Sequence, residues 1–167
     1  MDFFRWGAKY YKVTEKVEVA GLSPTDIASL PFQDQLVLLK TVAHSLRILH
    51  DRGIVHGDLK PSNVLIKRTD FGYTTKLIDF DNAYLAGEPP PPEEIVGTMN
   101  YYSPELVGYI QEDGTAAAEL TQKADIFALG LIYAEYLTGA LPAFDAGSYQ
   151  YAGVAARTGE ILRLPPT

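Results

Sequence analysis

The sequence predicts an α+β fold that is mainly α-helical, with a small β-hairpin and one further strand near the N-terminus. Three observations lead to this fold class. Residues 33–51 repeat apolar side chains at helical spacing, and residues 123–138 are apolar almost throughout. Residues 64–66 and 76–78 are short aliphatic runs separated by a polar turn, as in a hairpin. Residues 9–19 partly alternate polar and apolar side chains and are rich in Tyr and Val, which is typical of a strand.

A short helix is expected between the N-terminal strand and the 33–51 helix. Ser23 or Thr25 is expected to cap it, because a hydroxyl oxygen can accept hydrogen bonds from the free N–H groups of a first turn. Pro31 would end this helix after Leu30.

The two long helices carry recognisable C-terminal signals. Arg52-Gly53 follows the 33–51 helix and Gly139 follows the 123–138 helix, and glycine is the residue that most often ends a helix. Because apolar residues lie on almost every side of the 123–138 helix, we expect it to be central and buried.

The predicted hairpin brings two oxygen-bearing side chains together. Its strands, 64–66 and 76–78, are joined by the polar turn 68–72. Asn63 precedes the first strand and Asp79 follows the second, so both should lie at the open end of the hairpin. Amide and carboxylate oxygens are the ligands that hard cations prefer.

The remaining segments have no clear secondary structure. Residues 79–105 form a long irregular segment that includes four consecutive prolines from Pro89 to Pro92, and loops of this length are usually functional or disordered. Residues 108–118 have the composition of an insertion. The stretch from Leu141 onward is interrupted by Pro and Gly and gives no firm prediction.

Composition excludes several functional classes. The 167 residues are enough for one domain with its own core, and the net charge of −7 argues against nucleic-acid binding. The absence of cysteine excludes disulfides and thiolate metal sites. No apolar run reaches about 18 residues, and Met1 to Arg5 do not resemble a signal peptide. We therefore expect a cytoplasmic location with no membrane span.

The charges are unevenly distributed. Between Lys76 and Lys123 there are nine acidic residues and no Lys or Arg. A solvated acidic face is the favoured interpretation. The alternative is a surface that attracts a basic segment of a substrate.

Two short motifs contain the groups that phosphoryl transfer requires. Residues 56–63 read His-Gly-Asp-Leu-Lys-Pro-Ser-Asn, and Asp79-Phe80-Asp81 begins sixteen residues after Asn63. Phosphoryl transfer uses a carboxylate to orient a hydroxyl, a lysine to contact phosphate, and oxygen ligands for a metal.

Two further segments carry recognisable motifs. Residues 97–105 read Gly-Thr-Met-Asn-Tyr-Tyr-Ser-Pro-Glu, and residues 124–130 read Ala-Asp-Ile-Phe-Ala-Leu-Gly. Together the four motifs, in this order, resemble the eukaryotic-type protein kinase family over roughly Tyr10 to Phe144. The resemblance implies the C-terminal lobe of that fold, and Lys60 is similar to the Ser/Thr branch.

The resemblance implies a role for each polar residue of these motifs. Asp58 would accept the proton of the acceptor hydroxyl, and Lys60 would contact the transferred phosphate. Asn63 and Asp79 would hold Mg²⁺. Thr98 would bridge to Asp58 and Lys60.

The same resemblance implies a nucleotide-binding side. The strand over 9–19 would lead to the segment that binds the adenine of ATP. Thr14 would be the gatekeeper, Glu15 and Val17 would offer backbone groups to adenine, and Leu65 would form the floor of the adenine site.

Other residues of the motifs are expected to be structural. His56 is interpreted as a packing and hydrogen-bonding residue, and Glu105 belongs to the 97–105 segment. Asp125 would hold the backbone of the 56–58 loop, although an Asp at this place could also cap its own helix. His50, on the 33–51 helix, is expected to have no chemical role.

The chain departs from the family pattern in several places. Gly57 and Asp81 stand where the family usually has Arg and Gly. A glycine-rich loop, its partner lysine and the closing helices with the arginine that pairs with Glu105 are not found. We therefore expect residues 1–19 to be a remnant of the N-terminal lobe and residues 20–167 to be an incomplete C-terminal lobe. The remainder of the N-terminal lobe is then a missing partner, and the chain alone should be inactive.

Two alternatives remain open. His-Gly-Asp followed by Asn63 also resembles aminoglycoside and choline kinases, which phosphorylate small molecules. Those proteins usually lack a lysine at the place of Lys60 and a segment like 97–105, so a protein substrate with basic residues is favoured. The other alternative is a non-catalytic kinase-like interaction module.

Overall fold

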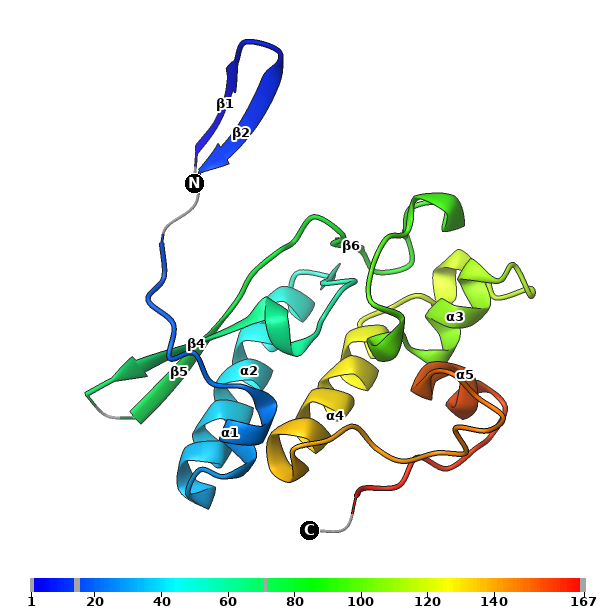
Figure 1. Ribbon diagram of the computed structural model, residues 1–167. Helices are drawn as coiled ribbons and strands as arrows, with labels where there is room; N and C mark the ends of the chain where they lie inside the picture. Colours follow the sequence, from blue (N-terminus) through cyan, green and yellow to red (C-terminus); the bar gives the residue numbers. More distant parts are fainter. Residues whose placement is uncertain (1, 14–15, 71, 166–167) are drawn as a thin grey trace.

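A computed structural model describes residues 2–13, 16–70 and 72–165. Figure 1 shows a helical body from which a β-hairpin extends on a linker near the N-terminus. The hairpin consists of β1 (Asp2–Trp6) and β2 (Lys9–Val13). Helices α1 (Pro24–Ala28), α2 (Phe32–His50) and α4 (Lys123–Thr138) form the centre of the body. In the part of the chain that is described, no helix is long and apolar enough to cross a membrane.

The main core lies where α2 meets α4 and the hairpin of β4 (Val64–Thr69) and β5 (Gly72–Leu77). The prediction of a buried central helix is confirmed, since half of the α4 residues are buried, Ile132 and Tyr136 almost completely. The core side chains are Ile27, Leu38, Leu39, Val42, Leu46, Leu59, Val64, Ile66, Leu77, Ala128, Leu129, Ile132 and Tyr136. Because Leu59 of the 56–63 loop is one of these side chains, the core supports that loop.

Two helix ends follow the sequence signals, whereas α1 ends at Ala28, two residues before the predicted Leu30. Ser23 caps α1 with a reciprocal pair of hydrogen bonds, because its hydroxyl accepts from the N–H of Asp26 and its own N–H donates to the Asp26 carboxylate. The C-cap of α4 is Gly139, whose φ of 79° is a left-handed conformation that glycine adopts without strain. Both predicted helix ends are confirmed.

The predicted central hairpin is confirmed and is longer than expected. The β4 and β5 strands pair from Val64 opposite Leu77 to Thr69 opposite Gly72. Beyond the paired strands, the N–H of Ile78 donates to the carbonyl of Asn63 at 3.0 Å. Asn63 and Asp79 therefore lie at the open end of this hairpin, as the sequence predicted.

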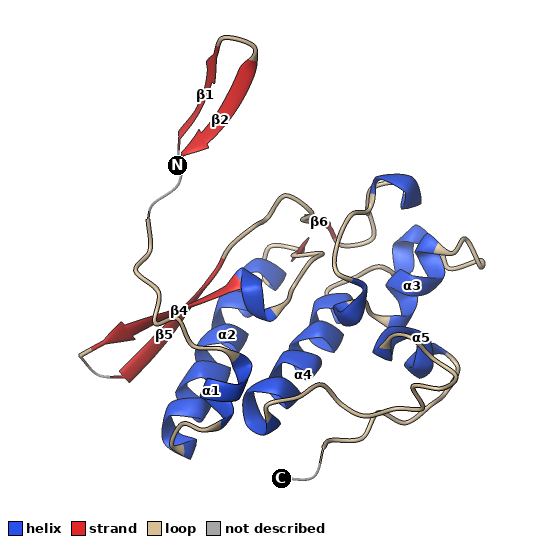
Figure 2. Ribbon diagram, viewed as in Figure 1, coloured by secondary structure: helices blue, strands red, loops and turns tan. Residues whose placement is uncertain are grey.

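The strand predicted over residues 9–19 is only partly right. Pairing with β1 ends at Val13, opposite Asp2, and residues 16–19 have no regular secondary structure. A strand needs a hydrogen-bonding neighbour, and β1 is too short to provide one further along. Figure 2 shows these residues as a loop that connects the hairpin to the body. Thr14 and Glu15 lie outside the described residues.

Several elements were not predicted from the sequence, β1 among them. The short strands β3 (Ile54–Val55) and β6 (Tyr84–Leu85) pair antiparallel, and β6 lies within the 79–105 segment that was expected to be irregular. Helix α3 (Pro104–Ile110) occupies part of the expected insertion, and α5 (Ala152–Arg157) lies in the C-terminal stretch. Residues 61–63, 92–94, 99–101 and 117–119 form short 3-10 helices. A second, smaller core of Tyr102, Leu106, Val107 and Leu120 holds this side together.

Candidate active site

The 56–63 loop is anchored from α4 by one buried carboxylate. Asp125, which is 2% exposed, accepts hydrogen bonds from the backbone N–H of His56 at 2.8 Å and of Gly57 at 3.2 Å. The N-cap of α4 is Gln122, and the Asp125 carboxylate bonds the loop instead of capping its own helix. The geometry thus corresponds to the loop-holding arrangement that the resemblance implied.

His50 is a third partner of this carboxylate. Its Nε2 lies 2.9 Å from Asp125 Oδ2, and because a carboxylate accepts, the imidazole nitrogen donates. His50 is the last residue of α2 and lies 75 residues before Asp125. Sequence reasoning gave this histidine no role, and no local pattern relates it to a residue so distant in the chain.

His56 connects the loop to the segment after β5. Its side chain is completely buried, and its Nε2 donates to the carbonyl oxygen of Ile78 at 3.0 Å. Its ring also packs on Phe80, with 5.0 Å between the ring centroids. These contacts are of the packing and hydrogen-bonding kind expected for this residue, and they place Asp79 beside the 56–63 loop.

Gly57 has a conformation and surroundings that exclude a side chain. Its φ is 79°, and a Cβ built there would lie 2.3 Å from the carbonyl oxygen of Asn82 and 3.2 Å from the Tyr84 ring. The residues after β5 therefore occupy the space that the family's usual arginine would enter. The glycine permits close backbone contact between the 56–63 loop and the following segment.

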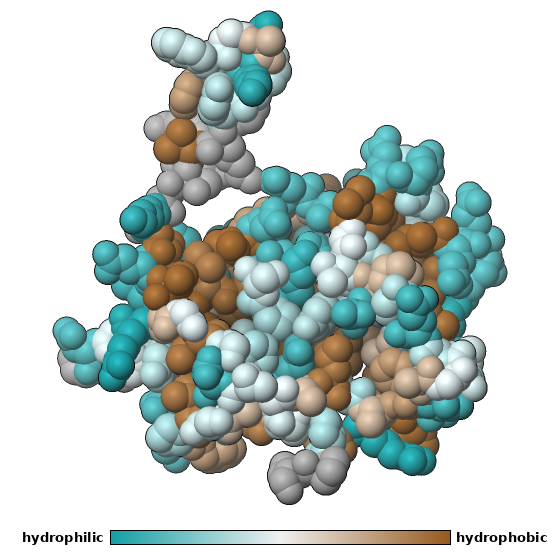
Figure 3. Space-filling view, in the orientation of Figure 1, coloured by the Kyte–Doolittle hydropathy of each residue, from teal (hydrophilic) through white to brown (hydrophobic). Residues whose placement is uncertain are grey.

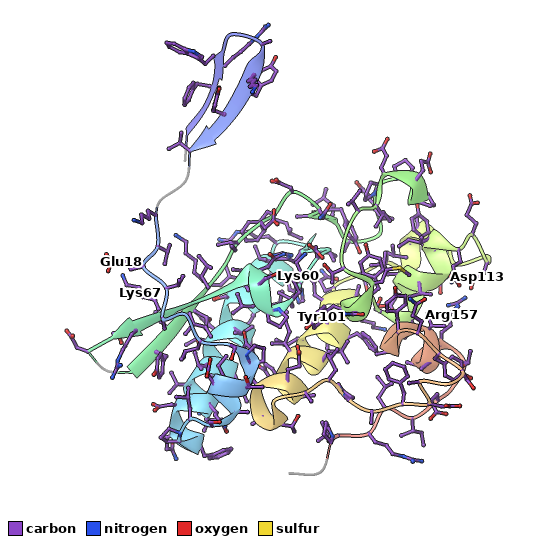
Figure 4. All side chains as sticks on the ribbon, viewed as in Figure 1. Glu18, Lys60, Lys67, Tyr101, Asp113 and Arg157 are labelled. Carbon is purple, nitrogen blue, oxygen red and sulfur yellow. The ribbon has the colours of Figure 1, made fainter. Side chains whose placement is uncertain are left out.

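Asp58, Lys60 and Thr98 form one polar cluster. The Lys60 ammonium donates to Asp58 Oδ2 at 2.6 Å and to Thr98 Oγ1 at 2.8 Å. The N–H of Thr98 donates to Asp58 Oδ1 at 3.1 Å. Asp58 is 6% exposed, so the lysine charge is needed to balance a nearly buried carboxylate. The structure thus joins a loop residue to a segment 40 residues away (Lys60 is labelled in Figure 4).

Tyr102 lies next to this cluster and stays neutral. Burial, with a smaller contribution from the negative charge of Asp58, raises the pKa of Tyr102 to about 12. Gly97 makes room for it, because a Cβ at Gly97 would lie 2.5 Å from the Tyr102 hydroxyl and 3.1 Å from Asp58 Oδ1.

Asn63 and Asp79, at the open end of the β4–β5 hairpin, each carry side-chain oxygens that could bind a metal. The amide nitrogen of Asn63 donates to the Asp58 backbone oxygen at 2.8 Å and to Oδ2 at 3.3 Å, so its amide oxygen points away from Asp58. Asp79 is exposed and has a φ of 63°, a backbone conformation that non-glycine residues adopt rarely and often at functional sites. One amide and one carboxylate suit Mg²⁺, which keeps several waters and binds few protein ligands. Across residues 2–13, 16–70 and 72–165, no three His, Cys, Asp or Glu side chains are grouped to hold a metal.

The residues expected on the nucleotide side are not all brought together. Leu65 lines an apolar cavity of about 180 Å³, together with Val19, Leu22 and Ser62. Val17 instead lines a separate hollow between the linker and the β4–β5 hairpin. Leu65 and Val17 therefore line two different hollows.

The 97–105 segment is attached to α4 and α5. The Tyr101 hydroxyl donates to Glu135 of α4 at 2.5 Å, and burial followed by this hydrogen bond raises the pKa of Tyr101. Glu105 is half-buried in the first turn of α3. Its neighbour Pro104 accepts a hydrogen bond from Arg157 of α5.

Comparison with known proteins gives a consistent result. The family model described as "Protein kinase domain" matches residues 2–164. The chain is 36% identical over 160 residues, 93% of its length, to the serine/threonine-protein kinase Pkn1 of Myxococcus xanthus. It is 34% identical over 147 residues, 83% of its length, to the serine/threonine-protein kinase PrkC of Bacillus subtilis. The matches cover only 21% and 20% of those two relatives' own lengths.

Proposed function

The chain belongs to the protein kinase domain family, and on this premise we propose that it carries the acceptor side of the catalytic site of a Ser/Thr-type protein kinase. The complete protein would transfer the γ-phosphate of ATP to a Ser or Thr hydroxyl of a protein. The observation that carries the proposal is the cluster of Asp58, Lys60 and Thr98, in which Thr98 contacts the distant 56–63 loop at 2.8 Å (Lys60) and 3.1 Å (Asp58).

Asp58 has the position and surroundings of a proton acceptor. The Thr98 N–H fixes one carboxylate oxygen and Lys60 balances the charge on the other, so the carboxylate is held in one orientation. In the transfer, the acceptor hydroxyl oxygen bonds to the γ-phosphorus, the bond from phosphorus to the β–γ bridging oxygen breaks, and the hydroxyl proton passes to Asp58. Lys60 would also stabilise the negative charge of the transferred phosphate.

Asn63 and Asp79 would hold Mg²⁺ through their side-chain oxygens. When bound, the ion supplies positive charge against the phosphates of ATP. Leu65 would form the floor of the adenine site, and the backbone of Glu15 and Val17 beside Thr14 would contact adenine. Residues 1–19 would then belong to the N-terminal lobe, and residues 20–167 to the C-terminal lobe.

The proposed substrate is a protein segment with basic residues. Acidic residues around the 92–94 and 111–114 turns are exposed, and Figure 3 shows hydrophilic residues there at the right edge of the molecule. A surface without Lys or Arg between residues 77 and 122 would attract a basic segment and raise its local concentration. Because the reaction consumes ATP, we propose a cytoplasmic location.

Substitution of Asp58 in the complete protein that contains this chain tests the proposal. Asp58→Asn should lower turnover by about 10²–10⁴-fold while nucleotide affinity changes little, because Asp58 contacts the acceptor and not ATP. Asp51→Asn is the matched control, since Asp51 is an exposed acid at the end of α2. Unchanged turnover in Asp58→Asn would contradict the proposed role.

The acceptor class is tested separately. Radiolabelled ATP is offered to a protein mixture and to a panel of aminoglycosides and small alcohols. We expect the label on protein Ser and Thr. Label only in small molecules would favour the small-molecule phosphotransferase, and no label in either would favour a non-catalytic module.

A further inference from the structure

Arg157, at the end of α5, contacts three residues in two separate parts of the chain. Its guanidinium forms an ion pair with Asp113 and donates through Nη2 to Thr115 Oγ1 at 3.3 Å. Its Nη1 donates to the carbonyl oxygen of Pro104 at 3.3 Å. Figure 4 shows the labelled side chains of Arg157 and Asp113 next to each other, between α5 and α3.

Gly108 provides the space for this arginine. A Cβ built on Gly108 would lie 2.4 Å from Arg157 Cζ and 2.5 Å from Nη1. Gly108 lies in α3, where its backbone is helical and alanine would ordinarily be more favourable. The local helix therefore does not explain this glycine, whereas the guanidinium packed against it does.

Helix α5 also packs directly on the 97–105 segment. A Cβ built on Gly153 would lie 2.1 Å from the carbonyl oxygen of Tyr102, so the two backbones touch. The hydrogen bond from Arg157 to Pro104 is a second attachment to the same segment. Thr98, in this segment, is the residue that contacts Asp58 and Lys60.

We propose that Arg157 is a positioning residue for the acceptor side of the site. It fastens the 97–105 segment, through Pro104, to α5 and to the loop of Asp113 and Thr115, and so keeps Thr98 against Asp58. Its significance for substrate binding rests on the proposed kinase activity. The attachment of the 97–105 segment to α5 does not rest on that activity, and it can be measured without any enzymatic assay.

Hydrogen exchange measured on the chain tests the fastening. Arg157→Gln should speed exchange of the Thr98, Tyr101 and Tyr102 amides at least about fivefold, because local opening of the segment becomes easier. Amides of α2 should be unchanged. Arg47→Gln is the control, because Arg47 also forms an ion pair with an Asp, but on the exposed side of α2. Unchanged exchange in 97–105, or an equal increase in α2, would overturn the proposal.

The glycine supplies a second, independent test. Gly108→Ala should lower the urea midpoint of the wild-type chain, because its methyl group meets the guanidinium. In an Arg157→Ala background that obstacle is gone, and the Thr115 hydroxyl can turn away, so the same alanine should be neutral or stabilising. An equal loss in both backgrounds would contradict the proposed packing.

A third measurement separates this inference from the proposed function. In the complete protein, Arg157→Gln should raise the KM for a protein substrate severalfold and leave the KM for ATP unchanged. If the exchange result is as expected but neither form phosphorylates anything, the fastening stands and the proposed function fails. A change in the KM for ATP alone would overturn the positioning role.

Discussion

The 56–63 loop and the N-terminal hairpin are stabilised in opposite ways. The loop has buried polar groups that are bonded to three distant parts of the chain, through Asp125, Thr98 and Ile78. The β1–β2 hairpin presents large side chains to solvent, with Trp6 75% and Tyr10 64% exposed. Its internal contacts are local, such as the stacked rings of Phe4 and Tyr11.

The difference indicates which half of the proposed site can form from this chain. Buried hydrogen-bonded networks hold one geometry, because leaving any member unpaired is costly. An isolated two-stranded hairpin is only marginally stable in water and has open edges that can pair with another strand. The acceptor side is therefore preorganised here, while the nucleotide side depends on contacts that the hairpin does not make by itself.

The largest expected effect is on turnover, at Asp79, between the acceptor side and the nucleotide side of the proposed site. In the complete protein, Asp79→Asn should lower Mg²⁺-dependent turnover by at least about 10²-fold, because the proposed metal ligand loses its charge. Asp70→Asn, at the other end of the same hairpin, is the control. Turnover like the wild type in Asp79→Asn would show that the metal is held elsewhere.

The next effect measures the stability of the loop network. Asp125→Ala leaves two backbone N–H groups and His50 without their acceptor, and should lower the free energy of unfolding by about 3–5 kcal/mol. Urea denaturation of the chain measures this. A loss of under about 1 kcal/mol, as for an ordinary surface residue, would mean that the network contributes little.

A smaller effect tests the close contact at Gly57. Gly57→Ala should lower the free energy of unfolding by about 2–4 kcal/mol. The new methyl group would meet the Asn82 backbone, and alanine would have to adopt a positive φ. Gly53→Ala has a similar φ of 72° but nothing within 4 Å, so it should cost only about 1 kcal/mol. Equal losses for the two variants would show that the segment simply moves aside.

A weaker effect, a dependence of stability on pH, is expected where Arg157 forms its ion pair with Asp113. Desolvation pushes the pKa of Asp113 up, but hydrogen bonds from Thr115 and Arg157 outweigh it, and the pKa lies below 3.8. A carboxyl with a depressed folded pKa stabilises the fold above its unfolded pKa, and this contribution is lost as pH falls through the folded value. The stability difference between wild type and Asp113→Asn should thus be present at pH 6 and diminish as pH falls through the lowered pKa of Asp113.

The smallest expected effect is at the hairpin. Trp6→Ala should change the free energy of unfolding of the body by no more than about 0.5 kcal/mol, because three quarters of this side chain already faces solvent. Leu46→Ala, on a fully buried position of α2, should cost about 2–5 kcal/mol. A large loss of stability in Trp6→Ala would show that the β1–β2 hairpin packs on the body. The contrast between this hairpin and the 56–63 loop would then not hold.

The sequence by itself determined the elements that depend on neighbouring residues. Helical spacing predicted α2 and α4, Ser23 and Gly139 predicted two of the helix ends, and two aliphatic runs predicted the β4–β5 hairpin. Helix hydrogen bonds, caps and tight turns join residues only a few positions apart, so their signals are local. The motif residues were also visible, because their order along the chain is itself the signal.

Only the tertiary structure decided which of these residues meet. The contact of Asp125 with the loop spans 69 residues, that of His50 with Asp125 spans 75, and that of Thr98 with Asp58 spans 40. The attachment of the 97–105 segment to Arg157 likewise joins residues far apart in the chain. The end of β2 at Val13 is set by its pairing with β1, in which Val13 lies opposite Asp2. Such contacts form because packing of the core brings the segments together, and no local periodicity encodes them.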